Sequence, residues 1–255
     1  INKVMASSAL KGQFLSGMMM PVMNTVANIS YVLVCLVGGM MAIKNNDVLF
    51  ITSIVAFISY VRSFNQPIEQ LASLRATPNT YVFRPADQKE TAYAYRAALK
   101  LNAPSVMALS RQNLPQLEDT CDKAMLGGYI LREPKGTPDV ILMASGSEVE
   151  LMYKAADILS VQGYTARLVS MPCMELFREQ SEEYQQSVLP ASIRARVSIE
   201  AGATQPWGAY VGLDGASIGL DHFGASAKGG VLFKEFGFTA ENVANAAIEV
   251  IKRNR

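Results

Sequence analysis

Cysteine and histidine are scarce in this sequence, and an excess of charge of one sign is absent. The three cysteines, Cys35, Cys121 and Cys173, lie far apart and form no C-x-x-C pair. An odd number of widely spaced thiols argues against a disulfide framework or a zinc site and favours a reducing compartment. His222 is the only histidine, so imidazoles cannot build a metal cluster. The formal net charge is +1 without a basic run, and we therefore expect no nucleic-acid partner.

Charged residues are also missing from the N-terminal part of the chain. No Asp, Glu, Lys or Arg occurs from Gly12 to Ile43, and a second apolar run follows at 48–61. A helix of about 20 apolar residues crosses a bilayer. The pattern predicts an N-terminal all-α apolar hairpin over 1–72, transmembrane-like, with membrane contact through 12–61. The chain would then be membrane-associated with its soluble part in the cytoplasm; the alternative is a buried helix pair in a cytoplasmic protein.

This apolar segment resembles the last two transmembrane helices of an ABC-type exporter. The resemblance is carried by GQFLSG at 12–17, VGG at 37–39 and IVAFISYVRSFNQPI at 54–68. Such exporters continue into a nucleotide-binding domain with a G-x-x-x-x-G-K-[ST] loop, whose backbone amides hold phosphates. That loop occurs nowhere in the sequence, so ATP-driven transport is not expected.

From Arg75 onward the hydrophobic pattern predicts strands and helices in alternation. We expect strands at 81–84, 105–110, 139–144, 164–170, 195–200 and 216–219, helices at 87–100, 148–162 and 239–252, and a loop over 111–128. This alternation predicts an α/β fold with an open, mostly parallel sheet. Asp87, with Glu90 three residues later, predicts a capped helix start. Ser147 is expected to cap the next helix, in preference to an anion site at 145–147.

Several strings in this part resemble transketolase. They are QPIEQLASLRATPN at 66–79, RPADQ at 84–88, ALSRQNLP at 108–115, ASGSEVEL at 144–151, VSMP at 169–172, VLP at 188–190, EAG at 200–202, FGASA at 223–227 and LFKEFGFT at 232–239. The resemblance covers about 66–255. It implies a remnant of the pyrimidine-binding domain at 73–135 and a transketolase C-terminal domain at 136–255.

The resemblance also implies a chemistry and one site residue. Transketolases move a two-carbon ketol unit between sugar phosphates with thiamine diphosphate and a divalent metal. Arg111 matches the arginine that grips the substrate phosphate, a role that suits its planar fork of donors; an ion pair of Arg111 with Glu118 is the alternative. The catalytic glutamate and the metal and diphosphate motif precede the matched stretch. No catalytic, cofactor-binding or metal residue is therefore assigned, and no cofactor is expected to bind this chain alone.

Three hypotheses about function remain open from the sequence. The first is a transketolase-like fragment, a transferase by family, that is inactive alone and acts as a homodimer or with a complementing transketolase chain. The second is a membrane protein, an exporter fragment that carries a soluble α/β binding or scaffold module. The third concerns origin: a chimeric reading frame joined at QPIEQLA, 66–72, which fits both families. We expect His222 in a surface loop, and Trp207 in packing.

Overall fold

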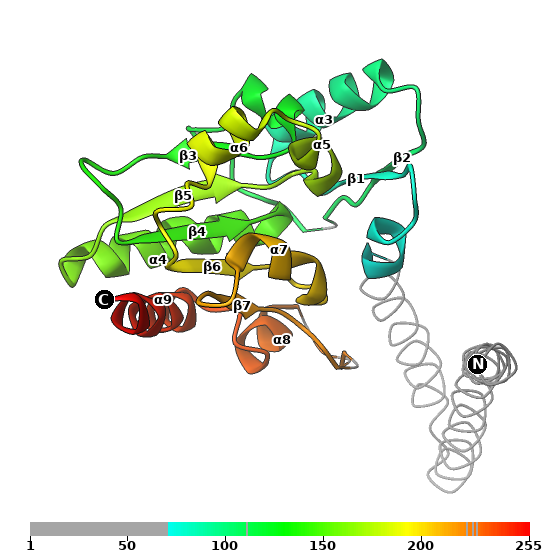
Figure 1. Ribbon diagram of the computed structural model, residues 1–255. Coiled ribbons are helices and arrows are strands. Elements are labelled where there is room, and N and C mark those ends of the chain that lie inside the picture. Colours follow the sequence, from blue (N-terminus) through cyan, green and yellow to red (C-terminus); the bar gives the residue numbers. More distant parts are fainter. Residues whose placement is uncertain (1–70, 111, 223, 226, 228) are drawn as a thin grey trace, which may run out of the picture. The chain divides into compact units, whose positions relative to one another are not determined.

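The protein is represented by a computed structural model, which describes residues 71–110, 112–222, 224–225, 227 and 229–255 (Figure 1). These residues all belong to one compact unit that runs from Phe64 to Arg255. Residues 1–70 of the expected apolar hairpin lie outside the described part of the chain, as does Arg111. No helix within the described ranges is both long and apolar enough to cross a bilayer.

The largest element is a five-stranded sheet with the strand order β3-β5-β4-β6-β7 (Figure 1). Its strands are β3 Tyr129–Arg132, β4 Val140–Ala144, β5 Ala166–Ser170, β6 Arg196–Ile199 and β7 Ala216–Ile218. Four of them pair in parallel, and β3 pairs antiparallel with β5 at one edge. The expected open and mostly parallel sheet is therefore confirmed. The antiparallel edge strand β3 was not expected from the sequence.

The central strand β4 explains how the sheet is covered on both faces. All five of its residues are buried. Alternate side chains of a strand point to opposite faces, so Leu142 packs into one core and Met143 into another. A strand buried on both faces reads as a continuous apolar run, which is why the sequence displayed one here.

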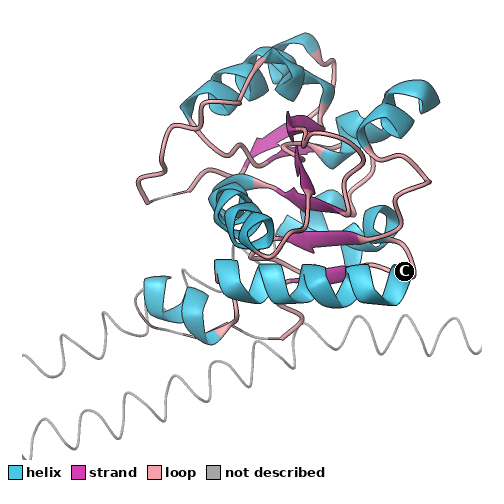
Figure 2. Ribbon diagram, turned by 90° about the vertical axis from the view of Figure 1, so that its left-hand side faces the viewer, coloured by secondary structure: helices cyan, strands magenta, loops and turns pink. Residues whose placement is uncertain are grey.

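Helices from distant parts of the chain supply the two covering layers (Figure 2). Helices α4 (Val149–Val161) and α9 (Ala240–Asn254) belong to the core on one side, with Met152 and Val243 fully buried. The other core contains Phe177 and Trp207. Four shorter helices also belong to this part of the chain: α5 Met174–Arg178, α6 Glu182–Val188, α7 Gly208–Val211 and α8 Gly229–Glu235. The 3-10 turns are η1 Asp122–Leu126, η2 Gly146–Glu148 and η3 Gln205–Trp207.

A second, two-stranded sheet precedes the larger one. Strand β1 (Tyr81–Phe83) pairs in parallel with β2 (Ser105–Met107), and helix α3 (Gln88–Lys100) connects them. The capped start of α3 is confirmed, because the Asp87 side chain accepts a hydrogen bond from the Glu90 amide at 2.8 Å. The reciprocal half of a capping box is not formed. The Glu90 carboxylate instead accepts from the amide of Ala86, at 2.7 Å.

The expected cap at Ser147 is wrong. Residues Gly146–Glu148 form the 3-10 turn η2, and Glu148 precedes the first residue of α4 without a side-chain cap. The Ser147 hydroxyl donates to the Glu148 carboxylate at 2.5 Å. The turn takes this form because Gly146, with a φ of 60°, donates its amide to the Arg84 carbonyl at 2.9 Å. A contact with another segment has thus replaced the local cap.

The expected domain boundary between 135 and 136 stays a prediction. Strand β3, which joins the five-stranded sheet, lies before that boundary. Other expected strands were close to those found, although the second ends at Met107 and not at Ser110.

Candidate functional site: a cavity at the ends of two parallel strands

Two of the motifs singled out in the sequence meet where β1 and β2 end. Phe83 lies opposite Met107 in the parallel pair, and the Ala108 amide donates to the Phe83 carbonyl at 2.8 Å. The crevice beyond the carboxyl ends of parallel strands is the usual ligand position in open α/β sheets.

A cavity of about 430 Å³, which we call the strand-end cavity, lies beyond these two strand ends. It is lined by Pro85, Asp87, Gln88, Thr91, Leu109, Ser110, Gln112, Asn113 and Leu114. These residues come from the RPADQ string with the start of α3, and from the ALSRQNLP string. Their amide and hydroxyl groups can donate and accept hydrogen bonds, which suits a ligand that carries several hydroxyls.

The N-terminus of α3 borders the strand-end cavity. The helix has 13 residues and its first residue, Gln88, lines the cavity. Exposed amides and the helix dipole favour anions at such an end. The Asp87 carboxylate is already engaged, since Oδ2 accepts from the Thr120 hydroxyl at 2.7 Å and from the Leu117 amide at 3.1 Å.

Arg111, the one substrate-binding residue expected from the sequence, lies outside the described residues. Its chain neighbours Ser110 and Gln112 both line the strand-end cavity. The phosphate-binding role of Arg111 stays a prediction, and so does the alternative pairing with Glu118.

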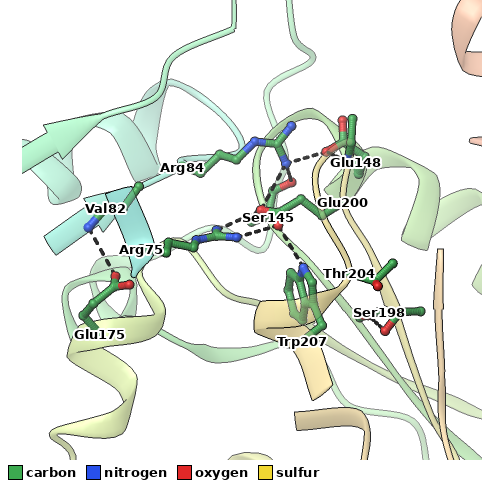
Figure 3. Close-up of polar contacts among 12 residues, drawn as sticks. Arg75, Val82, Arg84, Ser145, Glu148, Glu175, Ser198, Glu200, Thr204 and Trp207 are labelled. Atoms are coloured by element: carbon green, nitrogen blue, oxygen red, sulfur yellow. Dashed lines mark hydrogen bonds and ion pairs between the residues drawn. The ribbon is translucent and has the colours of Figure 1, made fainter. Parts of the chain in front are cut away.

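A buried ion-pair network lies at the carboxyl ends of β4 and β6 (Figure 3). It consists of Arg75, Arg84, Glu148 and Glu200. Arg75 donates two hydrogen bonds to Glu200, Nη1 to Oε2 at 2.5 Å and Nη2 to Oε1 at 2.8 Å. Arg84 pairs with Glu148 and lies 3.6 Å from Glu200. The indole nitrogen of Trp207 also donates to Glu200, at 2.9 Å.

The charges of this network stabilise one another. Burial by itself would raise the pKa of the Glu200 carboxyl, but the charges of Arg75 and Arg84 lower it to about 2. Burial by itself would lower the pKa of the Arg84 guanidinium, but the carboxylates of Glu148 and Glu200 raise it above its ordinary value. Both shifts favour the ionised forms of Glu200 and Arg84 at neutral pH.

None of these four residues was predicted from the sequence to form a site, although a signal was present. Arg84 comes directly after β1, and Glu200 directly after β6. A charged residue next to a buried strand end is a candidate for a buried pair or a ligand site. The packing role expected for Trp207 is confirmed, since it is 1% exposed in the core.

A third polar cluster surrounds Glu90, which is fully buried. Its Oε1 accepts from the Tyr129 hydroxyl at 2.7 Å and from the Ser170 hydroxyl at 2.6 Å. These partners are neutral. Burial therefore raises the pKa of the Glu90 carboxyl, although the hydrogen bonds from Ser170, Tyr129 and Ala86 act in the opposite direction.

No cluster of metal-ligating side chains forms among the residues with described positions. No three His, Cys, Asp or Glu side chains in that part of the chain come together as ligands would. His222 is exposed, as expected, and its ring centroid lies 5.3 Å from that of Phe236.

Comparison with protein families gives two matches. Residues 62–116 match the transketolase pyrimidine binding domain, and residues 127–239 match the transketolase-like TK C-terminal domain. The first match contains the whole lining of the strand-end cavity, and the second contains Glu148 and Glu200.

Curated and solved transketolases share this region. The chain is 55% identical over 190 residues to a chloroplastic transketolase of Solanum tuberosum, covering 73% of this chain and 26% of the relative. It is 52% identical over 191 residues to a chloroplastic transketolase of Craterostigma plantagineum, covering 73% of this chain and 37% of the relative. A crystal structure of Pichia stipitis transketolase superposes with a TM-score of 0.68 at 45% identity, covering 73% of this chain and 27% of that one.

The chain thus spans well under half the length of these relatives. The sequence matches and the fold agree over the shared region. The chain is a transketolase-like fragment, a member of the transketolase family that joins the end of the pyrimidine-binding domain to the C-terminal domain.

Proposed function

We propose that this chain contributes a sugar-phosphate site and a C-terminal domain to ketol transfer, and that it does not complete this reaction alone. The strand-end cavity carries the proposal. It joins the RPADQ and ALSRQNLP strings at the carboxyl ends of parallel strands, beside the N-terminus of α3. In this proposal Arg111 holds the substrate phosphate through two parallel hydrogen bonds.

The chemistry of solved relatives supports a sugar phosphate as the ligand. Pichia stipitis transketolase has been crystallised with sedoheptulose-7-phosphate, fructose-6-phosphate and xylulose-5-phosphate. All three carry a phosphate at one end and hydroxyls along the chain. The polar lining of the strand-end cavity suits the hydroxyls, and the end of α3 suits the phosphate.

A partner chain is the second part of the proposal. The intact family uses thiamine diphosphate and a divalent metal, and the described residues contain no group of three His, Cys, Asp or Glu side chains that could hold a metal by itself. A homodimer or a complementing transketolase chain would supply the missing groups. One solved relative is a split gene transketolase crystallised as an inactive beta4 tetramer, with 25% identity and a TM-score of 0.60, covering 63% of that chain.

Calorimetric titration with fructose-6-phosphate tests the first part. We expect the unaltered chain to bind and the Arg111→Ala variant to bind at least about tenfold more weakly, since a bidentate charged contact is lost. Arg96→Ala is the matched control, because Arg96 is an exposed arginine on α3. Equal affinity of the Arg111→Ala variant and the unaltered chain would disprove the assigned role.

A complementation assay tests the second part. The chain is mixed with a transketolase that lacks its own C-terminal part, in the presence of thiamine diphosphate and Mg²⁺. We expect ketol transfer from the mixture and none from either component. Turnover by this chain alone would refute the proposal.

We propose, further, that the reading frame is a chimera joined near 66–72; the match to the transketolase pyrimidine binding domain begins close to this position, at residue 62. Long sequencing reads across codons 60–75 test this proposal. Reads that pass through the join as one gene would support a real fusion, and reads that continue into two separate genes would count against it. The membrane-protein alternative has no supporting observation in the described part of the chain.

A further inference from the structure

The wall of the strand-end cavity is attached to the larger sheet through the backbone of Arg84. Its amide donates to the Pro172 carbonyl, which follows β5, at 2.7 Å. Its carbonyl accepts from the Gly146 amide, which follows β4, at 2.9 Å. This approach is close, since a Cβ added to Gly146 would lie 2.9 Å from the Arg84 side chain.

The Arg84 side chain also bonds to the residues that follow β4 (Figure 3). Nη1 donates to the Ser145 carbonyl at 2.8 Å and pairs with the Glu148 carboxylate. Glu148 is fully buried, and its Oε2 also accepts from the Ala201 amide at 3.0 Å, just after β6. One carboxylate therefore ties Arg84 to the ends of two central strands.

The next residues along the chain form the cavity itself. Pro85 and Asp87 line it. A proline restricts the residue before it to extended conformations and fixes its own φ. A displacement of Arg84 is consequently passed on to Pro85, because the intervening backbone has few alternative conformations.

We infer that Glu148, in the C-terminal domain, is a positioning residue for the strand-end cavity: through Arg84 it sets the place of the wall formed by Pro85 and Asp87. Ligands of open α/β sheets commonly lie where their parallel strands end. At the ends of β4 and β6, Arg75 and Arg84 occupy that position. Their ion pairs there hold the neighbouring strand-end cavity in place. The inference deepens the proposed function and rests on it for the ligand class.

The test compares Glu148→Gln with two controls in the full chain. Gln keeps the shape of the side chain and removes its charge. Glu150→Gln removes a carboxylate from the same helix, where Glu150 pairs with Lys154 at the surface at 2.5 Å. Val250→Ala opens a small space in the core around α9, where Val250 is buried, and so lowers stability away from the cavity.

Two measurements are made on each variant: hydrogen exchange of the Arg84 and Ala86 amides, and calorimetric affinity for fructose-6-phosphate. For Glu148→Gln we expect exchange about tenfold faster and affinity about tenfold weaker, as loss of a supporting contact commonly gives. Both controls should leave both values unchanged. Unaltered exchange in Glu148→Gln, or an equal affinity loss in Val250→Ala, would overturn the inference. If the unaltered chain does not bind the sugar phosphate, the proposed function fails, and the exchange measurement still decides whether Glu148 positions the loop.

Discussion

Arg75 and Glu200 lie 125 positions apart in the sequence and form a two-pronged ion pair, with side chains only 4% and 1% exposed. The pair joins a segment before β1 to the end of β6. Trp207 and Ser145 donate to the same carboxylate. Such a pair does little for stability compared with apolar packing, but the loss of one partner leaves a buried charge uncompensated.

Arg75→Ala should therefore lower the free energy of unfolding by about 3 kcal/mol. In the double variant Arg75→Ala with Glu200→Gln, the free energy of unfolding should fall by clearly less than the sum of the two single losses. The reason is that removing both partners leaves neither charge of the pair buried without a partner. Urea unfolding followed by circular dichroism measures both. Arg194→Ala is the surface control, since the side chain of Arg194 in its pair with Asp214 is 68% exposed, and a change below about 1 kcal/mol is expected. A similar small loss for Arg75→Ala would contradict the buried pair.

Lowering the pH should reduce the free energy of unfolding through protonation of Glu200. Its pKa is lowered from an ordinary 4.5 to about 2 in the folded protein, so the unfolded chain takes up a proton first. The stabilisation is present above pH 4.5 and is lost as the pH falls through about 2, with a total on the order of 3 kcal/mol. Unfolding free energies measured over this range should fall steeply for the unaltered chain and less steeply for Glu200→Gln. Parallel pH curves for the two proteins would show that Glu200 is not responsible.

Glu90 should make stability depend on pH in the opposite sense to Glu200. Burial raises the pKa of its carboxyl above 4.5, so the folded state favours the protonated form. Its contribution to stability is complete below pH 4.5 and is lost as the pH rises through the folded-state pKa. Glu90→Gln keeps a neutral group that can bond Tyr129 and Ser170, and it should remove this loss of stability on raising the pH. Glu183→Gln, at an exposed position of α6, controls for the removal of one negative charge. If Glu90→Gln loses as much stability on raising the pH as the unaltered chain does, Glu90 is not responsible.

Gly127→Ala should be among the most damaging single changes. The φ of Gly127 is 85°, and an added Cβ would lie 2.3 Å from the Cys173 carbonyl oxygen and 2.4 Å from the Phe177 amide nitrogen. Backbone atoms cannot move aside easily, so a loss above about 3 kcal/mol is expected. Gly163 is the matched control, with a φ of 82° and nothing within 4 Å of such a Cβ. Gly163→Ala should cost only about 1 kcal/mol. Thermal unfolding of the two variants separates steric conflict from backbone strain.

Local patterns were sufficient wherever neighbours in the chain control the structure. The apolar run of β4, the Asp87 cap of α3 and the parallel α/β order were all predicted and are present. Ser147 was predicted wrongly for the converse reason. Its turn is held by the contact between Gly146 and Arg84, which lie far apart in the sequence.

The motifs in the sequence by themselves determined the family and the succession of strands and helices, because both depend on residue order and short-range periodicity. Only the tertiary structure decided that Arg84 meets Glu148, that Glu90 is enclosed by Tyr129 and Ser170, and that the RPADQ and ALSRQNLP strings border one cavity. These arrangements depend on which strand ends come together and on how deeply each charge is buried. Neither property is encoded in the spacing of residues along the chain.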